Sequence, residues 1–389
     1  MRWLRRLGLV VAILLVIALA AGWNGLTGDN DAEDASVPST TTAAPGRVPP
    51  PIEGGTEDPR IACARELPPR QQVGQLLAVA VDGQAEDLDA PRVAQFGIGT
   101  VFLQSMTADR PIQRIQALKD ASTIPPLVAV DEEGGAVQDL RDVLGPFPSQ
   151  ERMAATTDVA GAHAQVLTHA QSMATLGIDV VFAPVVDVLP GDGRDPLGDD
   201  RIFSSDPAVV TDYGQAYVDA YVEAGILPTL KHFPGHGNTS GDSHDGVVVA
   251  PPLPQLRERD LVPYDTLLDS DVAVMVGHMV VPDVTIFTPS SLSADIAGGL
   301  LRDEYEFDGL IFTDSLSMGG VTGQGPPEEL AVRALAAGAD VALFATLPAP
   351  GPVLDRLVQA LRNGELDADQ VATSVVRVLD VKGIDPCEL

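Results

Sequence analysis

The sequence predicts a protein of the α/β class, built as one (β/α)8 barrel of the TIM type. Short apolar runs alternate with helix-forming stretches from about residue 70 onward. Most of these runs are apolar throughout, as expected for parallel strands that are buried on both faces. About eight such units fit into roughly 300 residues, which is the size of a TIM barrel. The alternative for the same elements is an open, doubly wound sheet.

The expected strands follow one another along the chain with helical segments between them. The strands are residues 76–81, 100–103, 127–130, 180–185, 229–232, 273–276, 310–313 and 341–344. The segments between them include 113–121, 208–224, 256–269 and 353–363, which have helical periodicity or good helix formers. This order of elements predicts a parallel sheet that is covered by helices.

Polar residues follow several of these runs directly. They are Asp131-Glu132-Glu133, Asp187, Lys231-His232, His278 and Asp314. A barrel brings the carboxyl ends of all its strands to one face, where barrel active sites lie. Ordinary loop polarity explains any one of these positions, but it explains the set poorly. We therefore expect one functional site at this face.

The segment ahead of the barrel has the layout of an export signal. Three arginines precede an apolar run over residues 7–22, and Ala18-Leu19-Ala20 has the small residues of a cleavage site. We expect residues 1–26 to be a signal peptide or a membrane anchor. The protein is then extracytoplasmic, either secreted or tethered to the membrane. Residues 27–60 are rich in Asp, Ser, Thr, Pro and Gly and are expected to be a disordered linker, with the barrel over 61–389.

Charge and cysteine content exclude several classes of protein. Asp and Glu number 55 against 24 Lys and Arg, and the formal net charge of −31 argues against nucleic acid as a partner. Two cysteines are too few for a Cys-rich zinc site or a disulfide scaffold. In an oxidising compartment Cys63 and Cys387 could join the two ends of the barrel domain, and the alternative is two unpaired thiols. We expect a monomer.

The densest chemistry lies between Lys231 and Gly246, where His232, His236 and His244 occur with several glycines. Asp242 and His244 are two residues apart, so the carboxylate can orient the imidazole by binding one of its nitrogens. The other nitrogen would then be free to act as a general acid and base. One alternative is a metal site formed by His232, His236, Asp242 and His244, although the ammonium of Lys231 counts against a nearby dication. Another is a loop with a purely structural role.

Two aspartates come directly after expected strands. Asp314 could attack the anomeric carbon of a sugar or stabilise positive charge there, and its alternative role is a helix N-cap. Asp131 precedes Gly134-Gly135 and could accept hydrogen bonds from substrate hydroxyls, or it could also be a cap. The residues alone indicate a barrel hydrolase with carboxylates and an Asp–His pair.

The segment Lys231 to Gly237, with Asp242-Ser243-His244 downstream, closely resembles the signature of glycoside hydrolase family 3. It is most similar to the single-domain branch, the exo-acting β-N-acetylglucosaminidases. The resemblance extends over roughly residues 70–380. It also includes the motifs Asp131-Glu132-Glu133-Gly134-Gly135, Phe182-Ala183-Pro184-Val185-Val186-Asp187, Asp200-Arg201 and Thr313-Asp314.

The resemblance implies a role for each matching residue. Asp314 would be the nucleophile, and His244, held by Asp242, would be the acid/base. Asp131, Arg201, Lys231 and His232 match positions that bind the non-reducing sugar. The implied reaction is double displacement with retention through a glycosyl-enzyme, with no metal or other cofactor. Because an imidazole acid/base does not repel an anionic acceptor, phosphorolysis is conceivable beside hydrolysis.

One departure from the family pattern affects these expectations. The paired glycines are usually followed by Arg-Val-x-Arg, whereas this chain has Ala136-Val137-Gln138-Asp139. The second arginine helps to line the sugar pocket in relatives, and Asp139 cannot supply its donors. Arg141 could reach in only if a helix did not point it elsewhere. We expect weaker binding, a shifted substrate or, at the extreme, a degenerate site.

The favoured hypothesis is an exo-β-N-acetylglucosaminidase that acts on N-acetylglucosamine-containing cell-wall (peptidoglycan) fragments. One alternative is another β-glycosidase or a phosphorylase of the same family. The other is a sugar-binding protein on a catalytically weakened barrel, which Ala136 and Asp139 motivate.

Overall fold

The computed structural model describes residues 58–347 and 349–389. The expected signal peptide or anchor at 1–26 and residues 27–57 of the expected linker lie outside this part. The first helix, α1 (Pro59–Glu66), begins two residues before the expected start of the barrel domain, and the side chain of Asp58 caps it by accepting from the Arg60 N–H. In the part of the chain that is described, no helix is long and apolar enough to cross a membrane.

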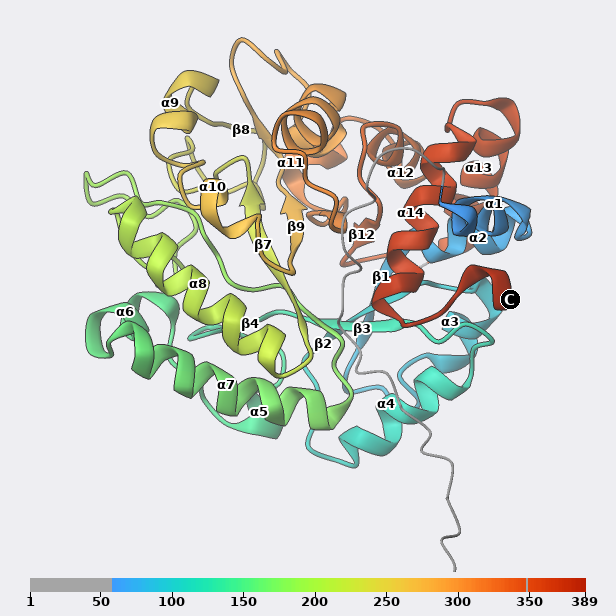
Figure 1. Ribbon diagram of the computed structural model, residues 1–389, viewed down its shortest axis with the longest axis horizontal. Helices are drawn as coiled ribbons and strands as arrows, with labels where there is room; N and C mark the ends of the chain where they lie inside the picture. The colour runs from blue at the N-terminus through green and yellow to red at the C-terminus, as the bar shows by residue number, and fades with distance from the viewer. Residues whose placement is uncertain (1–57, 348) are drawn as a thin grey trace, which may run out of the picture. The chain divides into compact units, whose positions relative to one another are not determined.

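Eight strands form one sheet in which each neighbouring pair is parallel (Figure 1). They are β1 (Leu77–Asp82), β2 (Thr100–Gln104), β3 (Leu127–Val130), β6 (Val180–Val181), β7 (Leu227–Phe233), β9 (Ala273–Val276), β11 (Ile311–Thr313) and β12 (Ala342–Phe344). β12 pairs with β1, and a bridge between Phe312 and Val341 links β11 to the β12 segment. The sheet therefore closes into a barrel, and the predicted fold class is confirmed.

The fourth strand is shorter than the sequence suggested. A strand was expected over 180–185, but β6 ends at Val181. Pro184 has no N–H to donate to a neighbouring strand, so the ladder cannot continue through it. Beyond the proline, the side chain of Gln150 binds both the N–H and the C=O of Val185, at 2.9 and 2.8 Å.

Helices cover the outer side of the sheet (Figure 1). They are α2 (Pro69–Gln75), α3 (Ala90–Phe96), α4 (Pro111–Asp120), α5 (Arg141–Leu144), α6 (Gln150–Thr156), α7 (Val159–Leu176), α8 (Pro207–Glu223), α9 (Leu253–Glu258), α10 (Tyr264–Leu267), α11 (Gly319–Thr322), α12 (Pro327–Ala336), α13 (Pro350–Asn363) and α14 (Ala368–Val381). The expectation of one helix over 256–269 is wrong. α9 ends at Glu258 and α10 begins after Pro263, which has no N–H to bond the carbonyl of Arg259 four residues earlier.

Smaller elements decorate the carboxyl ends of the barrel strands. β4 (Glu132–Gly134) and β5 (Val137–Gln138) form a hairpin directly after β3, and β8 (Val248–Val249) pairs in parallel with β10 (Met279–Val280). A π-helical segment covers Asp295–Glu304, and single 3₁₀ turns cover Ser290–Leu292 and Pro386–Glu388. The β4–β5 hairpin and the β8–β10 pair lie at the face where the sequence placed the site.

The barrel interior is filled by aromatic rings. Phe102, Phe182 and Phe312 project from three different strand regions, and the ring of Phe182 lies 5.5 Å from Phe102 and 5.4 Å from Phe312, centroid to centroid. All three side chains are buried. Tilted and edge-on contacts of this kind add to the stabilisation from burial. The packed interior gives the site a rigid floor.

The two ends of the described barrel are joined. A disulfide links Cys63 in α1 to Cys387 in the last 3₁₀ turn, with the Cα atoms 5.1 Å apart and a sequence separation of 324. The ends of a closed barrel meet, and α1 packs on α14.

The amino-terminal ends of the strands carry two similar aspartate contacts. Asp179 accepts the Val128 N–H at 2.8 Å and donates its own N–H to Val128 O at 2.9 Å. Asp340 makes the same pair of bonds with Ile311, both at 2.8 Å. Each carboxylate is also paired with cations, Asp179 with Lys119 and Asp340 with Arg302 and Arg377. These contacts fix the starts of β3 and β11.

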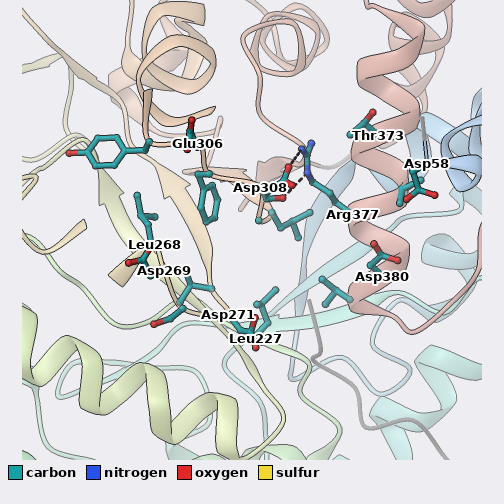
Figure 2. Close-up of a pocket in the computed structure, with 18 of the residues that line it drawn as sticks. Asp58, Leu227, Leu268, Asp269, Asp271, Glu306, Asp308, Thr373, Arg377 and Asp380 are labelled. Atoms are coloured by element: carbon teal, nitrogen blue, oxygen red, sulfur yellow. Dashed lines mark hydrogen bonds and ion pairs between the residues drawn. The ribbon is translucent and has the colours of Figure 1, made fainter. Parts of the chain in front are cut away.

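A cavity of about 450 Å³ lies at this amino-terminal face (Figure 2). It is bounded by the residues at or before the starts of β7, β9 and β11, which are Leu227, Val272 and Leu310. Asp308 and Arg377 form an ion pair in its wall, with Nη2 and Oδ1 2.9 Å apart. None of the residues assigned to the site from the sequence lines it.

Candidate active site

Four charged side chains form a buried network at the carboxyl ends of β3 and β7. The ammonium of Lys231 lies 2.5 Å from Asp131 Oδ1 and 2.6 Å from Glu133 Oε1. The guanidinium of Arg201 binds Glu133 with two parallel hydrogen bonds of 2.8 Å. Lys231, Glu133 and Arg201 are almost wholly buried, while Asp131 keeps 29% of its side-chain surface exposed. Asp131 is therefore the member of the network that is open to a ligand.

The network keeps its members charged in spite of burial. Burial disfavours the ionised form of Glu133, but Lys231 and Arg201 outweigh it and lower the pKa of Glu133 to about 2. Burial likewise opposes the charge of Lys231, yet Asp131 and Glu133 raise the pKa of this ammonium. Two cations thus balance two carboxylates, and their donors and acceptors are held in fixed positions before any ligand binds.

An irregularity in β7 brings two consecutive residues into the site. Lys231 pairs with Met275 and Phe233 with Val276, so β7 has one extra residue, His232, relative to β9. In a regular strand, neighbouring side chains would point to opposite faces. The extra residue in this β-bulge re-aims the chain, and Lys231 and His232 both reach carboxylates from other strands.

Asp187 orients the next part of the segment. Its Oδ2 lies 2.7 Å from His232 Nδ1, and its Oδ1 accepts the His236 N–H at 2.6 Å. Burial opposes ionisation of Asp187, but the neighbouring His232 ring lowers the pKa of this carboxyl. Because a carboxylate only accepts, Nδ1 of His232 carries the proton and Nε2 remains for a ligand.

Asp314 lies directly after β11 and is 9% exposed. Its Oδ1 accepts the Ser315 N–H at 2.7 Å, which leaves Oδ2 for another partner. Burial disfavours the charge, but His278, His232, the Ser315 N–H and His244 together lower the pKa of Asp314 to about 2. The carboxylate is therefore ionised at neutral pH, as a nucleophile must be.

His278 supports the segment around Asp314 from behind. Its Nε2 lies 2.8 Å from Ser315 O and its Nδ1 lies 2.7 Å from Ser291 Oγ. A carbonyl can only accept, so Nε2 carries the hydrogen. Burial lowers the pKa of His278, which favours the neutral ring, and Ser291 can then donate to Nδ1. The ring fixes the backbone next to the carboxylate.

Asp242 and His244 form the pair that the sequence suggested. His244 Nδ1 lies 2.7 Å from Asp242 Oδ1, and the same oxygen accepts the His244 N–H at 2.9 Å. The His244 side chain is 58% exposed, so its Nε2 can reach solvent and a ligand. Partial burial opposes ionisation of Asp242, but the bonds from His244 lower the pKa of this carboxyl. The pair has the geometry of a general acid/base held by a carboxylate.

Two glycines fasten the His244 loop to the segment after Asp314. The N–H groups of Gly319 and Gly320 donate to His244 O and Ser243 O, at 3.2 and 2.8 Å. A Cβ at Gly319 would lie 2.6 Å from His244 O, which is closer than real contacts allow. The close approach thus requires glycine, and it links the His244 loop to the segment that follows Asp314.

The residues that depart from the family pattern have other partners. The carboxylate of Asp139 accepts the Asp131 N–H at 2.9 Å and the Ser105 N–H at 3.0 Å. Arg141, on α5, binds Gly135 O and Gln138 Oε1 of the β4–β5 hairpin and does not join the charged network. Ala136 is exposed at the hairpin turn. The arginine donors of the family are therefore not replaced by Arg141.

The four residues of the alternative metal site do not converge. His232 binds Asp187, His236 lies between Ser243 and Thr239, and His244 binds Asp242. Burial lowers the pKa of His236 to about 4 and keeps it neutral, as a framework residue of the loop. In the described ranges, no group of three or more His, Cys, Asp or Glu side chains is arranged to hold a metal ion.

Sequence reasoning gave no separate role to Glu133, Asp187 or His278, although each follows an expected strand. Glu133 is two residues after Asp131, and alternation along β4 puts both side chains on one side, towards Lys231. That spacing was a usable signal. The partners of Asp187 and His278 come from segments that are far apart along the chain, so no comparable spacing pointed to these two residues.

Comparisons with known proteins bear directly on this site. Residues 69–381 match the family model described as "Glycosyl hydrolase family 3 N terminal domain". "Beta-hexosaminidase LpqI" from Mycobacterium tuberculosis is 42% identical over 390 residues, covering 97% of each chain. A solved glycosyl hydrolase of family 3 from Mycobacterium smegmatis has a TM-score of 0.77 and 41% identity, covering 82% of this chain and 98% of that one.

A more distant solved structure has the same fold. The family 3 β-N-acetylglucosaminidase from Paenibacillus sp. str. FPU-7 has a TM-score of 0.76 and 29% identity, covering 83% of this chain and 64% of that one. The family match spans most of the chain, and its range contains the buried network, the Asp–His pair and Asp314. The chain therefore belongs to glycosyl hydrolase family 3 and is a glycoside hydrolase.

Proposed function

We propose that this protein is a retaining exo-β-N-acetylglucosaminidase that releases terminal β-linked N-acetylglucosamine from cell-wall fragments. The observation that carries the proposal is the placement of an ionised, buried Asp314 in the same site as an exposed, carboxylate-held His244. The names of the relatives support it, since they describe a β-hexosaminidase and a β-N-acetylglucosaminidase.

In the first step, Asp314 Oδ2 attacks the anomeric carbon while the glycosidic bond breaks. The leaving oxygen takes the proton of His244 Nε2, because Nδ1 is occupied by Asp242. The bond formed is between Oδ2 and the anomeric carbon, and the bond broken is between that carbon and the leaving oxygen. The N–H of Ser315 stays on Oδ1 and holds the carboxylate in place.

In the second step, a water molecule gives its proton to Nε2 of the now neutral His244 and attacks the anomeric carbon. The bond to Asp314 breaks, and the sugar leaves with its original configuration, because two inversions restore it. His244 is again protonated and Asp314 is again a carboxylate. The positions of both groups are coupled through Gly319 and Gly320, which tie the loop to the Asp314 segment.

The charged network binds the non-reducing sugar in this proposal. Asp131 accepts from sugar hydroxyls, Lys231 and Arg201 supply donors, and His232 Nε2, whose ring carries its proton on Nδ1, accepts from a hydroxyl. Since Lys231 and Arg201 are already fixed by Glu133, they lose little side-chain entropy when the sugar binds. This is the preorganisation that transition-state stabilisation requires.

We propose further that the protein works outside the cytoplasm, secreted or tethered by residues 1–26. The disulfide between Cys63 and Cys387 supports this location, since such bonds persist in oxidising compartments. Fractionation of expressing cells, with intact-mass measurement of the mature chain, tests it. Protein found only in the cytosol, with reduced cysteines, would contradict the location without affecting the reaction.

The test of the activity uses the full chain and 4-nitrophenyl N-acetyl-β-D-glucosaminide, beside the corresponding β-glucoside. Release of nitrophenol from the first substrate, at least tenfold faster than from the second, is the expected result. A preference for the glucoside would assign another glycosidase activity. Repeating the assay with added phosphate and identifying the product, free sugar or sugar 1-phosphate, decides the acceptor.

A further inference from the structure

We propose that Asp139 is a positioning residue for sugar binding, which holds Asp131 and the end of β2 in the arrangement that the non-reducing sugar requires. This inference rests on the proposed function, because Asp131 is the hydroxyl acceptor only in a sugar-binding site. It assigns a role to Asp139, which stands where the family pattern has an arginine.

The contacts of Asp139 join two strand ends on the catalytic face. Its Oδ2 accepts the Asp131 N–H at 2.9 Å, and its own N–H donates to Asp131 O at 2.9 Å. Its Oδ1 accepts the Ser105 N–H at 3.0 Å, and its backbone oxygen accepts the Met106 N–H at 2.8 Å. The side chain supplies two of these four bonds, and both go to backbone groups rather than to side chains.

The segment after β2, which Asp139 contacts, has a backbone conformation that is unfavourable without support from other residues. Ser105 directly follows β2 and has a φ of +52°, in the left-handed region that residues other than glycine and asparagine rarely adopt. A conformation of this kind persists only where surrounding contacts impose it, and such positions cluster at functional sites. The Asp139 carboxylate is one of those contacts.

The same backbone pattern recurs at the other face, but with a different charge environment. Asp179 holds Val128 at the start of β3 as Asp139 holds Asp131 just after its end, and Asp179 is paired with Lys119. Among the residues that the structure describes, no Lys or Arg pairs with Asp139. Because like charges repel, a carboxylate that lies beside Asp131 without a cation of its own lowers the stability of the fold. Its presence is therefore better explained by a role in the site.

The charged groups around Asp139 explain how it acts through Asp131. On the strand segment that it contacts lie Asp131, Glu132 and Glu133, and the ammonium of Lys231 is bound by Asp131 and Glu133. On the side of Ser105, Arg114 binds Thr107 and several backbone oxygens. On its own C-terminal side, Arg141 is bound to the hairpin. Asp139 thus fixes the backbone of Asp131 and leaves the Asp131 side chain to Lys231 and the sugar.

The experiment compares Asp139→Asn with Asp179→Asn in the full chain, measuring kcat, KM and Tm with the aryl N-acetylglucosaminide. An amide at 139 can accept only one of the two N–H groups. The same change at 179 leaves an acceptor for the single Val128 N–H and removes the ion pair with Lys119 at the opposite end of β3. Burial, together with Asp131, raises the pKa of Asp139 to about 7, so the assays are run at pH 8, where the carboxylate is ionised.

We expect Asp139→Asn to raise KM about tenfold, as loss of one charge-assisted hydrogen bond implies, with kcat within twofold of the wild type. Asp179→Asn should lower Tm and leave KM unchanged. In the double variant Asp131→Asn/Asp139→Asn, KM should equal that of Asp131→Asn alone, because the second change acts through the first. Equal KM values for Asp139→Asn and the wild type, or additive effects in the double variant, would overturn the proposal.

Two further measurements keep the test decisive. If Asp139→Asn does not fold, Asp139→Glu keeps the charge but displaces both acceptor oxygens by the length of one methylene, so a raised KM with unchanged kcat is again required. If the wild type shows no turnover, the affinity for N-acetylglucosamine is measured by calorimetry, and Asp139→Asn must weaken it while Asp179→Asn must not. A wild type without turnover or sugar binding would remove the proposed function, and this inference with it.

Discussion

The two faces of the barrel use aspartates in opposite ways. At the amino-terminal face, Asp179 and Asp340 bind backbone N–H groups at strand starts, and each is neutralised by cations. At the carboxyl-terminal face, Asp139 makes the same kind of bond but faces another carboxylate, and Asp314 is surrounded by imidazoles. The backbone geometry is shared, and the difference lies in the charges around each carboxylate.

This difference separates stability from function within one fold. A buried carboxylate that is fully paired contributes to holding the chain together and has no capacity left for a ligand. A carboxylate that keeps a free oxygen, such as Asp314 Oδ2, or an exposed edge, such as Asp131, can act on a substrate. The comparison predicts that changes at one face alter activity and that equivalent changes at the other alter the free energy of unfolding.

The largest effect is expected from Asp314→Ala. Removing the nucleophile should lower kcat for the aryl N-acetylglucosaminide by about a thousandfold or more, because no other group can form the glycosyl-enzyme. Thermal unfolding of the same preparation serves as the control, and Tm should not fall by more than a few degrees. Residual activity above about a tenth of wild type would put the nucleophile elsewhere.

The next largest effect is expected from His244→Ala, and it should depend on the leaving group. A poor leaving group needs the proton of His244, so its hydrolysis should slow by about 10² to 10⁴-fold. A 2,4-dinitrophenyl substrate should escape this loss in the first step and show a burst, since breakdown of the glycosyl-enzyme becomes limiting. Equal losses for both substrates would show that His244 is not the acid/base.

At the opposite face, Asp340→Asn should affect stability alone. The change leaves the buried guanidinium of Arg302 without its carboxylate, and the free energy of unfolding in urea should fall by about 3 kcal/mol. The matched control is Asp308→Asn, whose carboxylate is 55% exposed and pairs with Arg377, and it should cost less than about 1 kcal/mol. A drop in kcat/KM of the folded Asp340→Asn protein would contradict the view that the amino-terminal face contributes to stability and not to activity.

Removing the disulfide should change the stability of the protein and leave its activity unchanged. Replacing Cys63 and Cys387 together by serine should lower the free energy of unfolding by about 2 to 4 kcal/mol, because the unfolded chain loses a long cross-linked loop. Turnover at 25 °C should stay within twofold of wild type, since neither cysteine lies near the site. Unchanged urea unfolding would mean that the bond does not restrict the unfolded chain.

The smallest expected effect is a difference in how the free energy of unfolding depends on pH at the two faces. The pKa of Asp139 is raised to about 7 by burial and by Asp131, so its contribution to stability is fully present below about pH 3.8 and is lost as pH rises to about 7. The pKa of Asp340 is lowered: burial opposes this, but Arg302 and Arg377 outweigh it, so its contribution is present above pH 3.8 and is lost as pH falls further. The two slopes therefore have opposite signs.

Urea unfolding from pH 3 to pH 8 measures both slopes. Asp139→Asn should remove a fall in stability between pH 4 and pH 7, and Asp340→Asn should remove a fall below pH 4. Each contribution is limited to about 1.4 kcal/mol per pH unit, the value for one proton. Slopes of the same sign for the two variants would contradict the assigned environments.

The fold could be predicted from sequence because local patterns determine it. Continuous apolar runs at regular intervals predicted all eight strands, and the errors arose at Pro184 and Pro263, where a missing N–H or a helix break overrode the pattern. The pairs Asp242–His244 and Asp131–Lys231 were within reach because spacing and strand ends point to them.

The contacts of Asp139 could not be predicted in the same way. The sequence showed only that an arginine of the family pattern is missing, and it suggested a weakened site. The partners of the carboxylate are backbone N–H groups of Asp131 and Ser105, and backbone groups leave no trace in residue identity. Asp187 and His278 were missed for a related reason, because their partners come from distant segments.

If Asp314 is the nucleophile, it forms a covalent bond with the sugar, and that bond can be trapped. The full chain is incubated with a 5-fluoro N-acetylglucosaminyl fluoride, which slows breakdown of the intermediate, and then digested and analysed by mass spectrometry. We expect one added sugar on the peptide that contains Asp314, and none in Asp314→Ala. Turnover of the reagent without any label, or a label on another residue, would contradict it.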